Sequence, residues 1–318
     1  MTILSNERAL PVTGVIVVLM TVFAMALTDA FMKFSSANLT LWQIYVLRSG
    51  IAIPVLLLLT RRAVRPAAPG WVAFRSGALL LMYLAIYAAI PILDLSVIAA
   101  SLYTAPLFIV LLSSLVLGER IARFQWAGIA TGLAGVLLIV RPAAAGFSPL
   151  PLIPVAAAFL YAIAAIVTRA KCRRETPMTM ALWLNITLLI AGTIASLAIG
   201  FAGPLPAYPF LFGSWTAMGM REWQIIAILA VLIVAVSIGL ARAYQSPKPQ
   251  IIATFDYAYL IFAAFWGYVF FGEVPDRATV AGMALIALAG AMVLGAAPST
   301  KGIAPSATPP GTTRPVHK

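Results

Sequence analysis

The sequence predicts an all-α integral membrane protein, with ten transmembrane helices arranged as two inverted five-helix repeats. Three observations lead to this prediction: the composition, the number of long apolar segments and an internal repeat. The chain of 318 residues is 63% hydrophobic and only 9% charged, whereas soluble domains carry about 25% charged residues. A water-soluble core cannot hide so much apolar surface, so the solvent of this protein must be mostly lipid.

Ten apolar segments are long enough to cross a bilayer, which takes about 20 helical residues. Lipid offers no hydrogen-bond partner to the backbone, so such segments must be helices unless they close a barrel. The segments are 11–33, 40–60, 73–92, 95–117, 124–140, 148–168, 179–202, 223–244, 251–271 and 278–296.

An internal repeat relates the two halves of the chain. Residues 98–140 align without a gap to residues 252–294 at a spacing of 154, with 10 of 43 positions identical. Both copies carry a Gly-Glu pair between two apolar runs, as is typical of the internal repeats in secondary transporters. Since five helices per half is an odd number, the second copy must be inverted relative to the first.

The distribution of Lys and Arg predicts the orientation. With the N-terminus inside, 16 of these residues lie in inside loops and tails and 4 outside, and Arg48 lies within a helix. Cytoplasmic loops carry the excess of positive charge, so both termini are expected in the cytoplasm and the protein in the inner membrane. The same loops explain the net charge of +12 without a nucleic-acid partner.

The boundaries follow from these segments. We expect an N-terminal cytoplasmic tail at 1–10, a first repeat at 11–141, a second at 148–296, and a Pro/Ser/Thr-rich disordered tail at 297–318. The single cysteine excludes an intrachain disulfide. The single histidine lies in the tail, so neither a metal site nor a cofactor is expected.

A family resemblance rests on the stretch LGERIARFQWAGIATGLAGVLLIV and its repeat FGEVPDRATVAGMALIALAG. They resemble the EamA-type members of the drug/metabolite transporter superfamily, and the likeness covers about residues 11–296. It implies ten helices, an inverted repeat and transport of small metabolites across the cytoplasmic membrane. Residues 29–33, Arg48 and residues 241–244 look like a subgroup that includes transporters of S-adenosylmethionine and riboflavin.

Three charged residues are candidates for substrate binding. Arg48 lies roughly 13 Å inside its helix, where an unpaired charge costs at least about 2.5 kcal/mol. It either holds an anionic group, pairs with Asp29 or Asp256, or snorkels outward. Asp29 either faces the cavity, for a cation or a proton, or pairs with Lys33 at i+4. Asp256 either serves the substrate or coupling ion, or bonds a neighbouring Tyr or Arg48.

Aromatic and amide side chains complete the predicted site. Tyr45 lies one turn before Arg48, and Tyr103 and Tyr257 recur by the repeat. A wall of such rings would suit a ring-bearing metabolite. Asn185 is a polar candidate, with a helix–helix hydrogen bond as the alternative.

The repeated corner, Gly118-Glu119 and Gly272-Glu273, predicts a structural role. We expect each Glu to bind backbone donors at the start of the helix that follows it, where negative charge is favoured. The glycines at 128, 132 and 135 predict close helix packing. The loop 203–221 either caps the outer mouth or forms an interfacial aromatic belt.

Together these features predict a secondary transporter that moves a small polar or zwitterionic metabolite by alternating access. Amino-acid-like, S-adenosyl and flavin- or nucleoside-like compounds fit the mixed charges. No ATP-binding motif is present, so an ion or substrate gradient must drive transport. A proton is one candidate, beside uniport and exchange. Membrane lipids are the expected partners, and the protein is expected as a monomer or homodimer. The alternative is a membrane-embedded enzyme or sensor that handles an amphipathic molecule.

Overall fold

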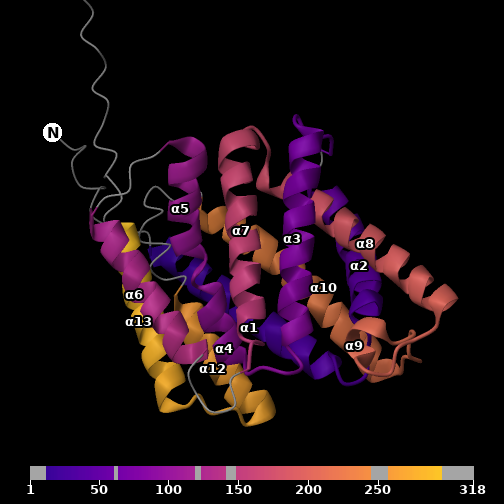
Figure 1. Cartoon of the computed structure of the whole chain (residues 1–318). Helices are drawn as coiled ribbons and strands as arrows, with labels where there is room; N and C mark the ends of the chain where they lie inside the picture. The colour runs from indigo at the N-terminus through magenta and orange to yellow at the C-terminus, as the bar shows by residue number, and fades with distance from the viewer. Residues whose placement is uncertain (1–11, 61–63, 119–122, 141–147, 245–256, 296–318) are drawn as a thin grey trace, which may run out of the picture.

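The computed structural model describes residues 12–60, 64–118, 123–140, 148–244 and 257–295. These residues form a bundle of helices, and no strand occurs among them (Figure 1). The helices are α1 (Val12–Ser35), α2 (Leu41–Thr60), α3 (Pro69–Ala89), α4 (Leu95–Leu102), α5 (Ala105–Leu117), α6 (Arg123–Val140), α7 (Leu152–Lys171), α8 (Pro177–Ala202), α9 (Pro209–Phe212), α10 (Met220–Tyr244), α12 (Ala258–Phe271) and α13 (Arg277–Gly295).

Seven spans in the described part of the chain are long and apolar enough to cross a membrane. One of them is the stretch Leu95–Leu117, which combines α4 and α5. The apolar helices Ala258–Phe271 and Arg277–Met292 are shorter. The prediction of an all-α membrane protein is therefore confirmed.

The predicted helix 95–117 is broken in two. The α-helix stops at Leu102 and resumes at Ala105, with Pro106 in the first turn of α5. Proline has no N–H and disfavours helical geometry in the residue before it, which accounts for the break. The backbone is satisfied locally, because Thr104 N–H and its hydroxyl both donate to the Ser101 carbonyl, at 3.2 and 2.6 Å.

Helices α6 and α13 pack side by side at one edge of the bundle (Figure 1). Their contact depends on glycine: a Cβ added to Gly135 would lie 2.8 Å from the Gly282 carbonyl oxygen, and a Cβ on Gly132 would collide with Leu107. The predicted packing role of Gly132 and Gly135 is confirmed. Helix α8 lies at the opposite edge, against α2 and α3.

The loop 203–221 contains the one-turn helix α9 and is fixed to the start of α2. Trp42 Nε1 donates to the Leu211 carbonyl at 2.7 Å. The Gln43 side chain both donates to and accepts from the backbone of Thr216, at 3.0 and 3.2 Å. The Thr216 hydroxyl also donates to the Asn38 carbonyl. These bonds hold the loop against the start of α2 and the short connection between α1 and α2.

Candidate functional site

Arg48 is a fully buried cation in the middle of α2. Its relative exposure is 0%, and Nε, Nη1 and Nη2 have no hydrogen-bond partner among the residues that the structure describes. Helix α2 has no other charged residue. Because arginine stays protonated in proteins, this is a buried charge with five N–H donors available. Outward snorkelling, one of the alternatives from the sequence, is wrong.

Three tyrosines surround the Arg48 guanidinium. It lies over the Tyr45 ring, 5.6 Å from the centroid, a geometry that stabilises cations. Tyr45 meets Tyr87 edge to face at 6.1 Å, and Tyr87 stacks on Tyr83 at 5.7 Å. The charge of Arg48 acts on all three rings, although Tyr87 lacks hydrogen-bond geometry toward it. Helices α2 and α3 thus form an aromatic wall beside an unpaired guanidinium.

A second group of tyrosines lies around Asp29 of α1. The Tyr259 hydroxyl of α12 donates to the Asp29 carboxylate. Tyr103 stacks on Tyr259 at 5.6 Å and meets Tyr257 at 4.9 Å. The charge of Arg48 acts on Asp29, but the two form no direct ion pair. The structure thus groups Tyr103 and Tyr257 around Tyr259, which binds Asp29, and it places Asp29 within electrostatic reach of Arg48.

Lys33 and Glu273 form an ion pair that links three elements. Lys33 Nζ binds Glu273 Oε1 and also donates to the Leu93 carbonyl. Glu273 Oε2 accepts the Leu95 N–H at 2.8 Å. The side chains are only 13% and 11% exposed. The proposed Asp29–Lys33 pair is therefore wrong, because the Lys33 ammonium is bound elsewhere.

The role predicted for Glu273 also needs correction. It binds the first N–H of α4 and not the start of α13, where Asp276 Oδ1 accepts the Thr279 N–H at 2.8 Å. The glycine half of the corner behaves alike in both copies: Gly118 and Gly272 end α5 and α12 in the left-handed conformation, at φ 70° and 68°. Glycine adopts this conformation without a Cβ clash.

The remaining predicted residues lie apart from these contacts. Asn185 is buried on α8, where Nδ2 donates to the Ala181 carbonyl and Oδ1 has no partner among the described residues. Gly192, two turns further along α8, faces the backbone of Trp42 and the side chain of Tyr45. Asp256 and Glu119 lie outside the described residues.

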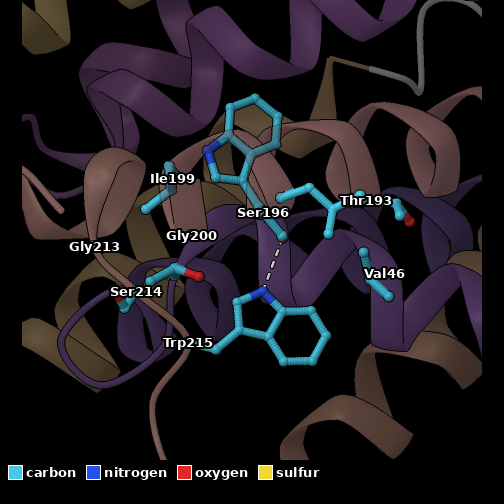
Figure 2. Close-up of a pocket in the computed structure, with 11 residues that line it drawn as sticks. Val46, Thr193, Ser196, Ile199, Gly200, Gly213, Ser214 and Trp215 are labelled. Carbon is cyan, nitrogen blue, oxygen red and sulfur yellow. Dashed lines mark hydrogen bonds between the residues drawn. The ribbon is translucent and has the colours of Figure 1, made fainter. Parts of the chain in front are cut away.

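A groove of about 470 Å³ lies between α2, α8 and the segment that follows α9. Figure 2 shows the side chains that line it. The volume of this groove suits a small ligand, and Trp215 Nε1 donates to Ser196 Oγ across it at 2.8 Å. None of its lining residues is charged, so it offers no partner for an ionic substrate. They are Thr40, Trp42, Val46, Thr193, Ser196, Leu197, Ile199, Gly200, Gly213, Ser214 and Trp215.

The sequence missed several members of the tyrosine cluster. Tyr83 and Tyr87 are spaced i, i+4 on one helix face, which is a signal that two rings share a site. Tyr259 follows Tyr257 by two residues and has no repeat partner, because position 105 is alanine. The repeat therefore drew attention to Tyr257 and away from the residue that binds Asp29.

Comparisons with known proteins all point to membrane transporters. Residues 12–141 match the model of the EamA-like transporter family. The pseudopaline exporter of Pseudomonas aeruginosa is 28% identical, over 87% of this chain and 94% of its own. A riboflavin transporter of Rhizobium johnstonii is 30% identical, over 83% and 82%. An S-adenosylmethionine uptake transporter of Rickettsia bellii is 23% identical, over 58% of each chain.

A solved crystal structure has the same fold. It superposes with a TM-score of 0.56 at 20% sequence identity, covering 88% of this chain and 94% of its own. With the apolar helices, these similarities define a multi-pass membrane protein that transports a small metabolite and is not an enzyme. The chain belongs to the EamA-like transporter family.

Proposed function

We propose that this protein moves a zwitterionic metabolite with an aromatic ring, by alternating access around Arg48. The observation that carries the proposal is the fully buried guanidinium without a partner among the described residues. Leaving buried donors unsatisfied costs about 1–3 kcal/mol or more, so a carboxylate that binds there gains a prepared partner. The planar guanidinium fork matches a carboxylate in two-point geometry.

The residues around Arg48 would bind the other parts of the substrate. Asp29 supplies a negative charge for a cationic group, and the stacked pair Tyr83 and Tyr87 supplies a surface for a ring. S-adenosylmethionine carries a carboxylate, positive charges and an adenine ring, so it fits all three. The relative that transports S-adenosylmethionine makes it a sensible first probe.

Two features support an inverted repeat of five plus five helices, the frame on which alternating access depends. The helices α5 and α12 share their left-handed glycine ends. Glu273, which follows α12, binds the N–H of Leu95, whereas Gly118 lies at the other end of the same span, Leu95–Leu117. The two corners therefore lie at opposite ends of one span, as inversion requires.

The orientation belongs to the same proposal. Both termini face the cytoplasm and the protein lies in the inner membrane, because 16 Lys and Arg residues then fall on the inside. Asp29 is the carboxylate available near Arg48 for a coupling proton, and the oligomeric state is a monomer or homodimer.

The test is uptake of labelled S-adenosylmethionine into proteoliposomes, together with a thermal-shift measurement. A saturating ligand at about 100 times its Kd adds about 2.7 kcal/mol to the stability of the folded state. Arg48→Gln should lose both signals and Arg48→Lys most of the transport. Arg221→Gln is the matched control, because Arg221 is exposed and lies over the Phe34 ring at 4.8 Å.

One competing explanation is a structural ion pair between Arg48 and Asp256. In that case Asp256→Asn would lower the unfolding temperature as much as it lowers transport. Full transport by Arg48→Gln would disprove the proposed site.

A further inference from the structure

Arg75 is a second arginine within the bundle, on α3. Its Nε donates to the Thr168 hydroxyl of α7 at 2.7 Å. That hydroxyl in turn donates to the Ala164 carbonyl at 2.7 Å. Thr168 thus uses its one proton on its own helix and turns its oxygen toward Arg75. This arrangement fixes one edge of the guanidinium.

One terminal nitrogen of Arg75, Nη1, is buried and is not satisfied by any residue that the structure describes. Glu175, the acidic residue close to this end of the bundle, accepts the Ala68 N–H at 2.8 Å and forms no ion pair with Arg75. Arg75 therefore repeats the main property of Arg48: a held guanidinium with a free donor.

A basic pocket of about 320 Å³ lies where α3 begins and α7 ends, and Arg75 lies in the first half of α3. Lys171, Arg173 and Arg174 line it together with Glu175. Cys172, in the middle of this run, is buried and feels the charges of both Arg75 and Glu175. Arg75 is the one cation of α3, so it is the next positive charge along this helix from the pocket.

Tyr83 lies within electrostatic range of both arginines. The charges of Arg48 and Arg75 both act on its hydroxyl, and it stacks on Tyr87 beside Arg48. Arg75 and Tyr83 are eight residues apart on one helix, which is about 12 Å of rise. Moving a carboxylate through the bundle with no cation nearby carries a large desolvation cost, so Arg75 would give it an intermediate partner on the way to Arg48.

We infer that Arg75 is a second binding station for the anionic group of the substrate, between the basic pocket and Arg48. The inference rests on the proposed function, since it concerns the same carboxylate at an earlier point of its path. Arg75 holds the group by Nη1 while Thr168 holds Nε, and Tyr83 lies within electrostatic range of both stations. Entry and release on the face where α3 begins pass through Arg75.

The test compares Arg75→Gln, Arg75→Lys and Arg221→Gln in membrane vesicles of the two opposite orientations, with labelled S-adenosylmethionine. From the face where α3 begins, Arg75→Gln should raise KM about tenfold while kcat stays within about twofold. Arg75→Lys should recover part of the loss, and Arg221→Gln should match the wild type. A merely structural role would lower the amount of active protein, and hence kcat, without this change in KM.

A second readout is local to the station. Bound S-adenosylmethionine should slow maleimide modification of Cys172 in the wild type and in Arg221→Gln, but not in Arg75→Gln. If Arg75→Gln keeps the wild-type KM and the protection while Arg48→Gln loses transport, the second station is wrong and the proposed function stands. If the wild type itself neither moves nor binds S-adenosylmethionine, the substrate class is wrong and the second station is rejected with it.

Discussion

Two basic side chains inside this bundle have opposite surroundings: Lys33 has an ion-pair partner, and Arg48 has none among the described residues. Lys33 has an ion pair with Glu273 and a bond to the Leu93 carbonyl, and Glu273 uses its second oxygen on the Leu95 N–H. Arg48 has a tyrosine ring below it and no hydrogen-bond partner among the described residues. The satisfied charge of Lys33 holds helices together, whereas we expect the unsatisfied charge of Arg48 to bind a substrate.

This difference in hydrogen bonding predicts different roles for the Lys33–Glu273 pair and for Arg48. The Lys33–Glu273 pair joins the end of α1, the start of α4 and the end of α12, so it stabilises the packing of these three elements. Arg48 makes no side-chain hydrogen bond to another element among the residues that the structure describes. We therefore expect Lys33 and Glu273 to govern stability, and Arg48 to govern transport.

The largest expected effect is on transport in Arg48→Met. Removing the guanidinium should lower S-adenosylmethionine uptake by at least about 100-fold. The midpoint of thermal unfolding in detergent should not fall, because an unpaired buried charge that costs at least about 2.5 kcal/mol is removed. A marked drop in this midpoint would show that Arg48 has a structural partner, and the contrast with Lys33 would disappear.

The next largest effect is on stability in Glu273→Gln. This change leaves the Lys33 ammonium buried without its counter-ion, and we expect a loss of about 3 kcal/mol, at the lower end of the range for a broken buried pair. Thermal unfolding in detergent measures it. The double variant Lys33→Met with Glu273→Gln should recover much of the loss, since no uncompensated charge remains. Wild-type stability in Glu273→Gln would mean that the pair is not formed in the membrane.

A smaller effect is expected for Tyr259→Phe, which removes the hydroxyl that binds Asp29. Hydrogen bonds to charged groups contribute about 1.5–3 kcal/mol, part of which water or substrate can replace. We expect KM to change about 3- to 10-fold with little effect on folding. Tyr268→Phe is the matched control, because it lies on the same helix and is 63% exposed. Equal KM values in the two variants would remove Asp29 from the site.

The smallest effect is expected for Tyr208→Phe in the loop that covers the α1–α2 end. Its hydroxyl donates to the Ala88 carbonyl, and burial raises the pKa of the phenol above its ordinary value. The neutral hydrogen bond is worth about 1 kcal/mol. Its contribution is complete below the ordinary pKa of tyrosine, about 10, and is lost as the pH rises through the raised value. A loss as large as that of Glu273→Gln would contradict this ranking.

The sequence predicted the spans well because their signal is local. Apolar length alone placed 95–117 and 124–140 within a few residues of the helices, and Arg48 was recognised because its surroundings along the chain are uncharged. The partner of Lys33 was not predictable in this way, since Glu273 lies 240 residues away and only packing of α1 against α12 brings them together. Asp29 lies four residues before Lys33, at helical spacing, and this spacing led to the incorrect prediction of an Asp29–Lys33 pair.

Alkylation of Cys172 offers a way to measure the opening motion that we propose. Cys172 is the only cysteine in the chain, it follows directly after α7, and it is 2% exposed. Burial raises the pKa of its thiol, an effect that the Arg75 charge opposes, so the reactive thiolate is scarce at neutral pH. Alkylation in the closed state must therefore be slow. If α3 and α7 separate as the proposed mechanism requires, we expect the rate of modification to rise with the fraction of time for which the packing of Cys172 against Val72 and Val167 is open.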